Sequence, residues 1–257
     1  MNNEIVSLTD EYIWDPEPLD PELAAALCTG MMGPMIGHPL VHQPLYSPEL
    51  NRMFNQSLRA KKEYVREALA GGDWSKYIWL HEKPYRLQAI WNIHQYLTPE
   101  EYWPLVAEVW MNVENHWQYK ALLPRLFKAK PRRYQLIMTD EERTILEGHQ
   151  DNILTIYRGH QRKNSRGWSW TFSPSRAEWF AKRFSQDGKW TIAEAQIDRR
   201  LVIAFFNRRG ENEIVVNPRT REFLDMTKAR VLLSPEQLVQ LTRVSTGISL
   251  DVRPSRE

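Results

Sequence analysis

Cysteine is almost absent from this chain, since Cys28 is its single example among 257 residues. An internal disulfide requires two cysteines and a thiolate metal cluster requires several, so both are excluded. We therefore expect a protein of the reducing cytoplasm with no metal centre. The opening residues, MNNEIVSLTD, lack the basic and apolar regions of a secretory signal, which favours the same location.

Long hydrophobic runs are missing as well. The uncharged stretch over residues 23–48 contains four prolines and three glycines. A bilayer-spanning helix needs about 20 apolar residues with few such interruptions, so this stretch predicts a buried, irregular segment and no membrane partner. The hydrophobic fraction of 42% is too high for a disordered chain, and the length fits one large domain or two small ones.

Net charge is low, at +2, but it is unevenly distributed along the chain. Residues 1–150 hold 15 Lys and Arg against 20 Asp and Glu, whereas residues 151–257 hold 19 against 12. A basic half suits an anionic ligand such as a nucleic acid, a phosphate-bearing cofactor or an acidic protein. A solvated surface would give the same balance.

Residues 48–147 show helical signals. Phe54 and Leu58 have helical spacing before the closing pair Gly71–Gly72. Two later segments combine a threonine cap with acidic residues in the first turn: Thr98-Pro99-Glu100-Glu101 and Thr139-Asp140-Glu141-Glu142. After the first of these, an apolar stripe contains Trp103, Val106, Trp110 and Val113. Tryptophans at helical spacing indicate a core rather than a surface that stacks nucleobases.

The pattern changes near residue 152, where short segments rich in β-branched and aromatic residues begin. They predict strands over residues 153–158, 168–172, 190–197, 201–206, 213–216 and 229–233. One helix interrupts them after the capping residue Ser173, and another is expected from Ser234. The sequence thus predicts an α+β protein with a mainly helical region over 1–150 and a strand-rich domain over 151–257.

Three of these strands carry polar residues with chemical potential. They are Tyr157-Arg158-Gly159, Ser169-Trp170-Thr171-Phe172-Ser173 and Glu211-Asn212-Glu213-Ile214-Val215-Val216. Because strand side chains alternate between faces, the two glutamates would share a face with about 6.5–7 Å between their Cα atoms. Each motif alone has a simpler interpretation: a surface arginine, a helix cap at Ser173, or a solvated carboxylate pair.

The order and spacing of the three motifs resemble the Arg–Ser–Glu class of ADP-ribosyltransferases, which includes bacterial toxins and small phage enzymes. The resemblance covers about residues 152–235. Residues 81–91 (HEKPYRLQAIW) look like the N-terminal part of some phage and bacterial members. SWTFS stands where the class has Ser-Thr-Ser, so Ser169 is the first candidate for the conserved serine role and Thr171 the second. The resemblance implies a mixed β-sandwich domain over 151–257 and NAD as the substrate.

The resemblance also implies roles for individual residues. Arg158 would bind the pyrophosphate, and the backbone of Gly159 would approach the nicotinamide amide. Ser169 would position Glu213, which would hold the donor ribose and stabilise an oxocarbenium-like transition state. Glu211 would orient or deprotonate the acceptor. Further expected contacts with NAD come from Thr171 and Ser173.

Two further segments have open interpretations. Phe180 or Phe184 would flank the nicotinamide or simply pack in the helix core. Arg208-Arg209-Gly210 resembles a target-recognition loop and is equally compatible with a charged turn.

The expected function is that of a bacterial or phage-encoded mono-ADP-ribosyltransferase that modifies a macromolecule. A protein is preferred to a nucleic acid as the acceptor. The alternatives are an NAD glycohydrolase, a nucleic-acid ADP-ribosyltransferase and a basic, tryptophan-rich binding module without catalysis. The binding module would require the carboxylate pair to be incidental, although carboxylates in a phosphate-binding cleft weaken nucleic-acid binding.

Overall fold

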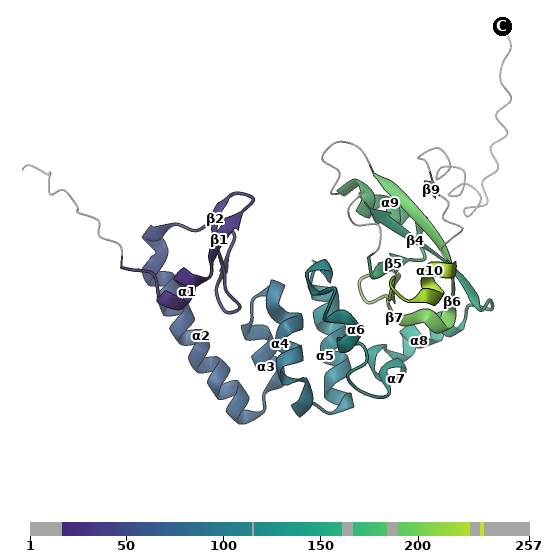
Figure 1. Ribbon diagram of the computed structural model, residues 1–257. Helices are drawn as coiled ribbons and strands as arrows, with labels where there is room; N and C mark the ends of the chain where they lie inside the picture. Colours follow the sequence, from purple (N-terminus) through teal and green to yellow (C-terminus); the bar gives the residue numbers. More distant parts are fainter. Residues whose placement is uncertain (1–16, 115, 161–166, 184–189, 227–231, 234–257) are drawn as a thin grey trace, which may run out of the picture. The chain divides into compact units, whose positions relative to one another are not determined.

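The computed structural model describes residues 17–114, 116–160, 167–183, 190–226 and 232–233. The chain forms two compact units, the first ending at Ile93 and the second beginning at His94. Each unit combines helices with an antiparallel sheet, so the chain is of mixed α+β class (Figure 1). Among the described helices, none is both long enough and apolar enough to cross a bilayer.

The first unit contains a small sheet that sequence analysis did not predict. Its strands are β1 (Leu27–Gly30), β2 (Gly33–Gly37) and β3 (His42–Gln43), within the stretch expected to be irregular. A hairpin forms because Gly33, with a φ of 124°, adopts a backbone conformation that other residues rarely reach. The helices are α1 (Pro21–Ala25), α2 (Asn51–Gly71), α3 (Trp74–Leu80) and α4 (Arg86–Ile93).

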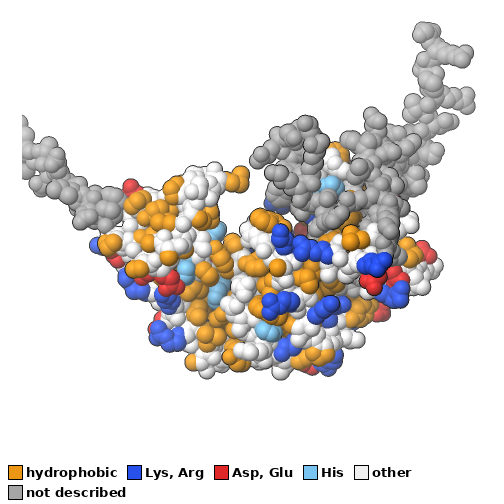
Figure 2. All heavy atoms as spheres, in the orientation of Figure 1, with side chains coloured by type: hydrophobic (Ala, Val, Ile, Leu, Met, Phe, Trp, Pro, Cys, Tyr) orange, Lys and Arg blue, Asp and Glu red, His pale blue; other side chains and the backbone are white. Residues whose placement is uncertain are grey.

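The core of this unit joins the sheet to α1 and α2. It contains Leu23, Ile36, Leu40, Val41, Phe54 and Leu58. The tip of the β1–β2 hairpin, by contrast, exposes apolar side chains (Figure 2), with Met31 97% and Met32 70% exposed. His38, the buried histidine that follows β2, pairs its Nε2 with Glu22 Oε1 at 2.9 Å.

The second unit begins with helices, two of which start after the capping threonines that the sequence predicts. They are α5 (Pro99–Asn112), α6 (Leu123–Leu126), α7 (Arg133–Ile137) and α8 (Asp140–Glu147). Thr98 and Glu101 form a reciprocal capping box at α5, and Thr139 and Glu142 form another at α8. Both predicted helix starts are confirmed.

A six-stranded antiparallel sheet follows, with strand order β7-β8-β5-β4-β6-β9. The strands are β4 (Ile153–His160), β5 (Ser169–Thr171), β6 (Thr191–Asp198), β7 (Val202–Phe206), β8 (Glu213–Val216) and β9 (Leu232–Leu233). Helix α9 (Pro174–Arg183) lies against β4 (Figure 1), and α10 (Arg221–Met226) follows β8. Residues 229–231 and the helix expected from Ser234 lie outside the described residues.

The strand order brings the three motifs together. β5 lies between β4 and β8, with Thr171 paired to Tyr157 on one side and to Glu213 on the other. The secondary structure changes from helix to strand near residue 150 as predicted, but the compact unit begins earlier, at His94. The helices α5–α8 belong with the sheet because their aromatic residues pack against it, as in the stack of Phe127 on Trp168 with centroids 5.7 Å apart.

Candidate active site

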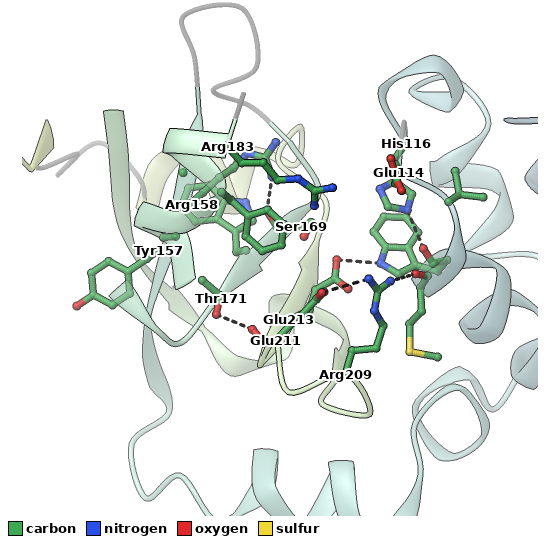
Figure 3. A pocket seen from close by; sticks show the side chains of 17 residues that line it. Glu114, His116, Tyr157, Arg158, Ser169, Thr171, Arg183, Arg209, Glu211 and Glu213 are labelled. Atoms are coloured by element: carbon green, nitrogen blue, oxygen red, sulfur yellow. Dashed lines mark hydrogen bonds and ion pairs between the residues drawn. The ribbon is translucent and has the colours of Figure 1, made fainter. Parts of the chain in front are cut away.

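A pocket of about 220 Å³ lies within the second unit, between β4, β5, β8, α9 and the C-terminal end of α5 (Figure 3). Six of the seven residues that the sequence predicted for the site line it: Arg158, Gly159, Ser169, Thr171, Glu211 and Glu213. Ser173 is the one that does not.

Glu213 is the first residue of β8, and its side chain is buried in the pocket wall, with 9% of the residue exposed. The indole Nε1–H of Trp110 donates a hydrogen bond to its Oε1 at 3.0 Å, and Ser169 is a second side-chain hydrogen-bond partner. Desolvation raises the pKa of Glu213, and the negative charge of Glu211 adds to this. The hydrogen bonds from Ser169 and Trp110 and the charge of Arg209 lower the pKa again.

The hydroxyl row of β5 divides into different roles. Thr171 Oγ1 donates to the carbonyl oxygen of Glu211 at 2.9 Å and accepts from the backbone N–H of Ser173 at 3.1 Å. Thr171 therefore fixes the loop that carries Glu211, whereas Ser169 is the hydroxyl that bonds to Glu213. Ser173 caps α9, because its Oγ accepts from the N–H of Arg176 at 3.2 Å.

Glu211 and Glu213 do not share a face of one extended strand, so that prediction is wrong. β8 begins only at Glu213, and Asn212 between the two glutamates is left-handed with a φ of 47°. Gly210 is also left-handed, with a φ of 64°, so the chain turns sharply before the strand. Both carboxylates still line the pocket, because the turn brings Glu211 beside Arg209, whose Nη2 is 3.4 Å from Glu211 Oε1.

Arg158 donates a hydrogen bond from its guanidinium to the carbonyl oxygen of Ser169. The group also lies against the backbone of Gly167, where any Cβ would be 2.1 Å from the Arg158 Cζ. Burial lowers the pKa of Arg158 to about 10, and attraction to Glu213 partly offsets the effect. The side chain stays cationic at neutral pH and places a planar donor group beside the buried carboxylate.

The turn Arg208-Arg209-Gly210 has two separate anchors. Arg208 Nη2 donates to Glu142 Oε2 at 3.0 Å and to the carbonyl oxygen of Ile137 at 3.3 Å, which ties the turn to α7 and α8. Arg209 lines the pocket and donates to the carbonyl oxygen of Met111 at the end of α5. Arg208 therefore has a structural role in the turn, and the role of the segment in target recognition stays a prediction.

Sequence reasoning missed the part of the pocket that comes from α5 and the segment after it. Trp110 was predicted as core, and it is fully buried, but it also contacts Glu213. His116 stacks on the Trp110 ring, with centroids 3.8 Å apart, and donates from Nε2 to the Trp110 carbonyl oxygen at 3.0 Å. Burial lowers the pKa of His116 to about 4, so it is neutral at neutral pH.

Helix α9 contributes the remaining wall. Phe180 and Arg183 line the pocket, while Phe184 lies outside the described residues. Figure 3 shows the Arg183 side chain directed toward the space between Ser169 and Glu213, and the Tyr157 ring directed away from the carboxylates. The α9 wall therefore adds the cation of Arg183, which the sequence did not identify, and the ring of Phe180, for which a place beside nicotinamide stays a prediction.

No protein-family model, curated protein sequence or solved structure matches this chain. Within the described residues, no group of three or more His, Cys, Asp or Glu side chains is arranged to hold a metal ion. The functional interpretation therefore depends on the pocket geometry together with the motif resemblance.

Proposed function

We propose that this chain is an NAD-dependent mono-ADP-ribosyltransferase that modifies a macromolecule in a bacterial cytoplasm. The preferred class of acceptor is a protein. The observation that carries the proposal is the meeting of Arg158, Ser169 and Glu213, from three adjacent strands, in one pocket. We further propose that the second unit adopts the sandwich fold of that enzyme class, for which the six-stranded sheet supplies one layer.

On the donor side, the bond between the ribose C1′ and the nicotinamide nitrogen breaks, and nicotinamide leaves with the bonding electron pair. Positive charge then develops at C1′ and the ring oxygen, as in glycoside cleavage. Ionised Glu213 would stabilise that charge without reorganisation, because Ser169 and Trp110 already hold its carboxylate. Arg158 would bind the pyrophosphate through charge-assisted hydrogen bonds.

On the acceptor side, a nucleophile forms a new bond to C1′ and releases a proton, which Glu211 would accept. Glu211 suits this role because it lines the same pocket from the loop just before β8, and Thr171 holds its backbone carbonyl. If water takes the place of the acceptor, the same donor chemistry yields an NAD glycohydrolase. The basic balance of residues 151–257 favours a nucleic acid as the second acceptor class.

The test is incubation of the purified chain with labelled NAD and a bacterial lysate, followed by mass spectrometry of labelled molecules. Glu213→Gln is the inactive variant, and Glu222→Gln, on the exposed face of α10, is the matched control. Labelled protein that requires Glu213 and not Glu222 supports the transferase. Nicotinamide release without labelling would indicate a glycohydrolase, and salt-sensitive nucleic-acid binding without NAD consumption would indicate a binding module.

A further inference from the structure

Helix α5 carries two fully buried tryptophans that use the same donor group on different acceptors. Trp103 donates its Nε1–H to the carbonyl oxygen of Pro131 at 2.8 Å. Trp110, two helical turns later, donates its Nε1–H to the Glu213 carboxylate at 3.0 Å. The acceptor of Trp103 is a backbone carbonyl oxygen, which does not ionise. The acceptor of Trp110 is an ionisable side chain in the pocket.

The Trp110 ring is held on two sides. His116 stacks on it at an interplanar angle of 18°, and Phe127 meets it edge-on with centroids 5.3 Å apart. The hydrogen bond from His116 Nε2 to the Trp110 carbonyl oxygen closes the arrangement. Because its neighbours fix the ring, the indole N–H has a defined position before any ligand binds.

Two neutral donors, the Ser169 hydroxyl and the Trp110 indole, thus act on one carboxylate from different elements. We propose that Trp110 is a positioning residue for Glu213, holding its carboxylate in the orientation that faces the pocket. The catalytic consequence of this role rests on the proposed function, whereas the coupling between indole and carboxylate does not. Helix α5, which carries Trp110, is then part of the active site together with the strands.

Several charged and titratable groups surround Glu213. Glu211 and Arg209 face it from the loop before β8, Arg158 from β4, and the neutral His116 from the segment after α5. Two further charged residues line the same pocket, Arg183 of α9 and Glu114 after α5. Loss of the indole N–H removes a hydrogen bond that favours the carboxylate form and leaves these charges in place. The pKa of Glu213 therefore rises further in a variant without the indole.

The experiment compares Trp110→Phe with Trp103→Phe, since both changes remove a buried indole donor from the same helix. In Trp110→Phe, we expect nicotinamide release to fall about tenfold or more in kcat, with little change in KM for NAD. The acid limb of its pH profile moves to higher pH. Trp103→Phe controls for lost packing and leaves the acid limb where it is. An unmoved acid limb in folded Trp110→Phe overturns the proposal.

A second readout needs no NAD turnover. The Trp110 indole N–H signal in ¹⁵N-labelled protein is identified by its loss in Trp110→Phe and followed against pH. We expect it to titrate with Glu213 and to lose that titration in Glu213→Gln, while the Trp103 signal does not respond. A Trp110 signal insensitive to Glu213→Gln overturns the coupling. A titrating signal in a protein without NAD turnover supports the coupling and overturns the proposed function.

Discussion

The carbonyl oxygen of Ala177 lies 1.9 Å from the position that a Cβ on residue 159 would occupy. The backbone nitrogen of Ala181 is 2.6 Å from the same position. Helix α9 therefore packs directly on the β4 backbone at Gly159, one residue after Arg158. The expected approach of the Gly159 backbone to nicotinamide is one reason for a glycine here, and the packing of α9 is a second reason that holds without any ligand.

Gly159→Ala should therefore destabilise the fold, because the obstructing atoms are helix backbone and cannot rotate away. Overpacking of this kind costs about 1–3 kcal/mol or more, measured as a loss in unfolding free energy by chemical denaturation. Gly71→Ala is the control, since a Cβ there meets nothing within 4 Å. At this helical position alanine is expected to be neutral or stabilising by up to about 1 kcal/mol. Equal stability of the two variants would contradict the packing argument.

Arg158→Ala should weaken NAD binding by about 1.5–3 kcal/mol, which is roughly tenfold to 150-fold, because a charge-assisted pair with the pyrophosphate is lost. The same change removes the hydrogen bond to the Ser169 carbonyl oxygen, so the folded fraction must be measured in parallel. Arg200→Ala is the control, since Arg200 is exposed and pairs with Asp198 outside the pocket. Calorimetric titration with NAD measures the affinities of the variants and the parent chain. Equal affinity for Arg158→Ala and the parent chain would contradict the assignment of Arg158 to the pyrophosphate.

Local signals account for the part of the fold that the sequence predicted. A capping box needs only residues three positions apart, so Thr98 and Thr139 identify their helices without tertiary information. The same holds for the strand motifs, whose composition and spacing are read within a few residues. The adjacency of the three motif strands in one sheet depends on long-range pairing, which these local signals do not specify.

Long-range contacts account for what was missed. Trp110 and Glu213 are 103 positions apart, and a buried tryptophan in a helix has the same sequence pattern with or without such a partner. Asn212 has a left-handed backbone within a segment whose sequence is typical of a strand. Glu211 therefore lines the pocket because of a turn, and the alternation of strand side chains does not explain its position. The start of the second unit at His94 depends on helix packing against a sheet that follows much later in the chain.

Glu213→Gln should stabilise the folded chain at neutral pH while it lowers activity. Burial raises the pKa of Glu213 above its ordinary value of 4.5, so folding disfavours the ionised form. The contribution of Glu213 to stability is therefore fully present below pH 4.5 and is lost as pH rises through the raised folded-state pKa. Glutamine has no such dependence, so the gain in melting temperature appears at about pH 8 and disappears near about pH 4.

The activity of Glu213→Gln should fall, although its stability at neutral pH rises. Loss of one preorganised electrostatic partner typically lowers the rate by about 10²–10³, so nicotinamide release and target labelling fall together. Wild-type nicotinamide release by Glu213→Gln would make Glu213 a structural residue.

Glu142→Gln is the contrasting variant for stability. Glu142 is also buried, but its carboxylate accepts from Arg208 at 3.0 Å and from the backbone N–H groups of Asn207 and Thr139 at 3.0 and 2.9 Å. Removal of its charge leaves a cation without its ionic partner, so this variant should lose stability at neutral pH. Thermal melts of the two variants at the same pH should shift in opposite directions, and a shift in the same direction would contradict the electrostatic explanation.

Glu211→Gln should separate transfer from hydrolysis. Its side chain loses the charge that would take the acceptor proton, and general-base catalysis typically contributes about 10²–10⁴ in rate. The Glu211 backbone stays held by Thr171 at 2.9 Å, so the pocket keeps its shape and Glu213 is left in place. Target labelling should therefore fall strongly while most of the slower nicotinamide release remains, because water needs less positioning than a macromolecular acceptor.

Arg209→Ala tests whether transfer depends on the ion pair between Arg209 and Glu211 or on the Glu211 carboxylate itself. It removes the cation 3.4 Å from Glu211 Oε1 and leaves the carboxylate itself. If Glu211 acts as the base, Arg209→Ala retains more labelling than Glu211→Gln, since the proton acceptor is still present. Nicotinamide release and labelling are measured in the same reactions for both variants. Equal loss of both activities in Glu211→Gln would place Glu211 on the donor side, and unchanged labelling would leave it without a catalytic role.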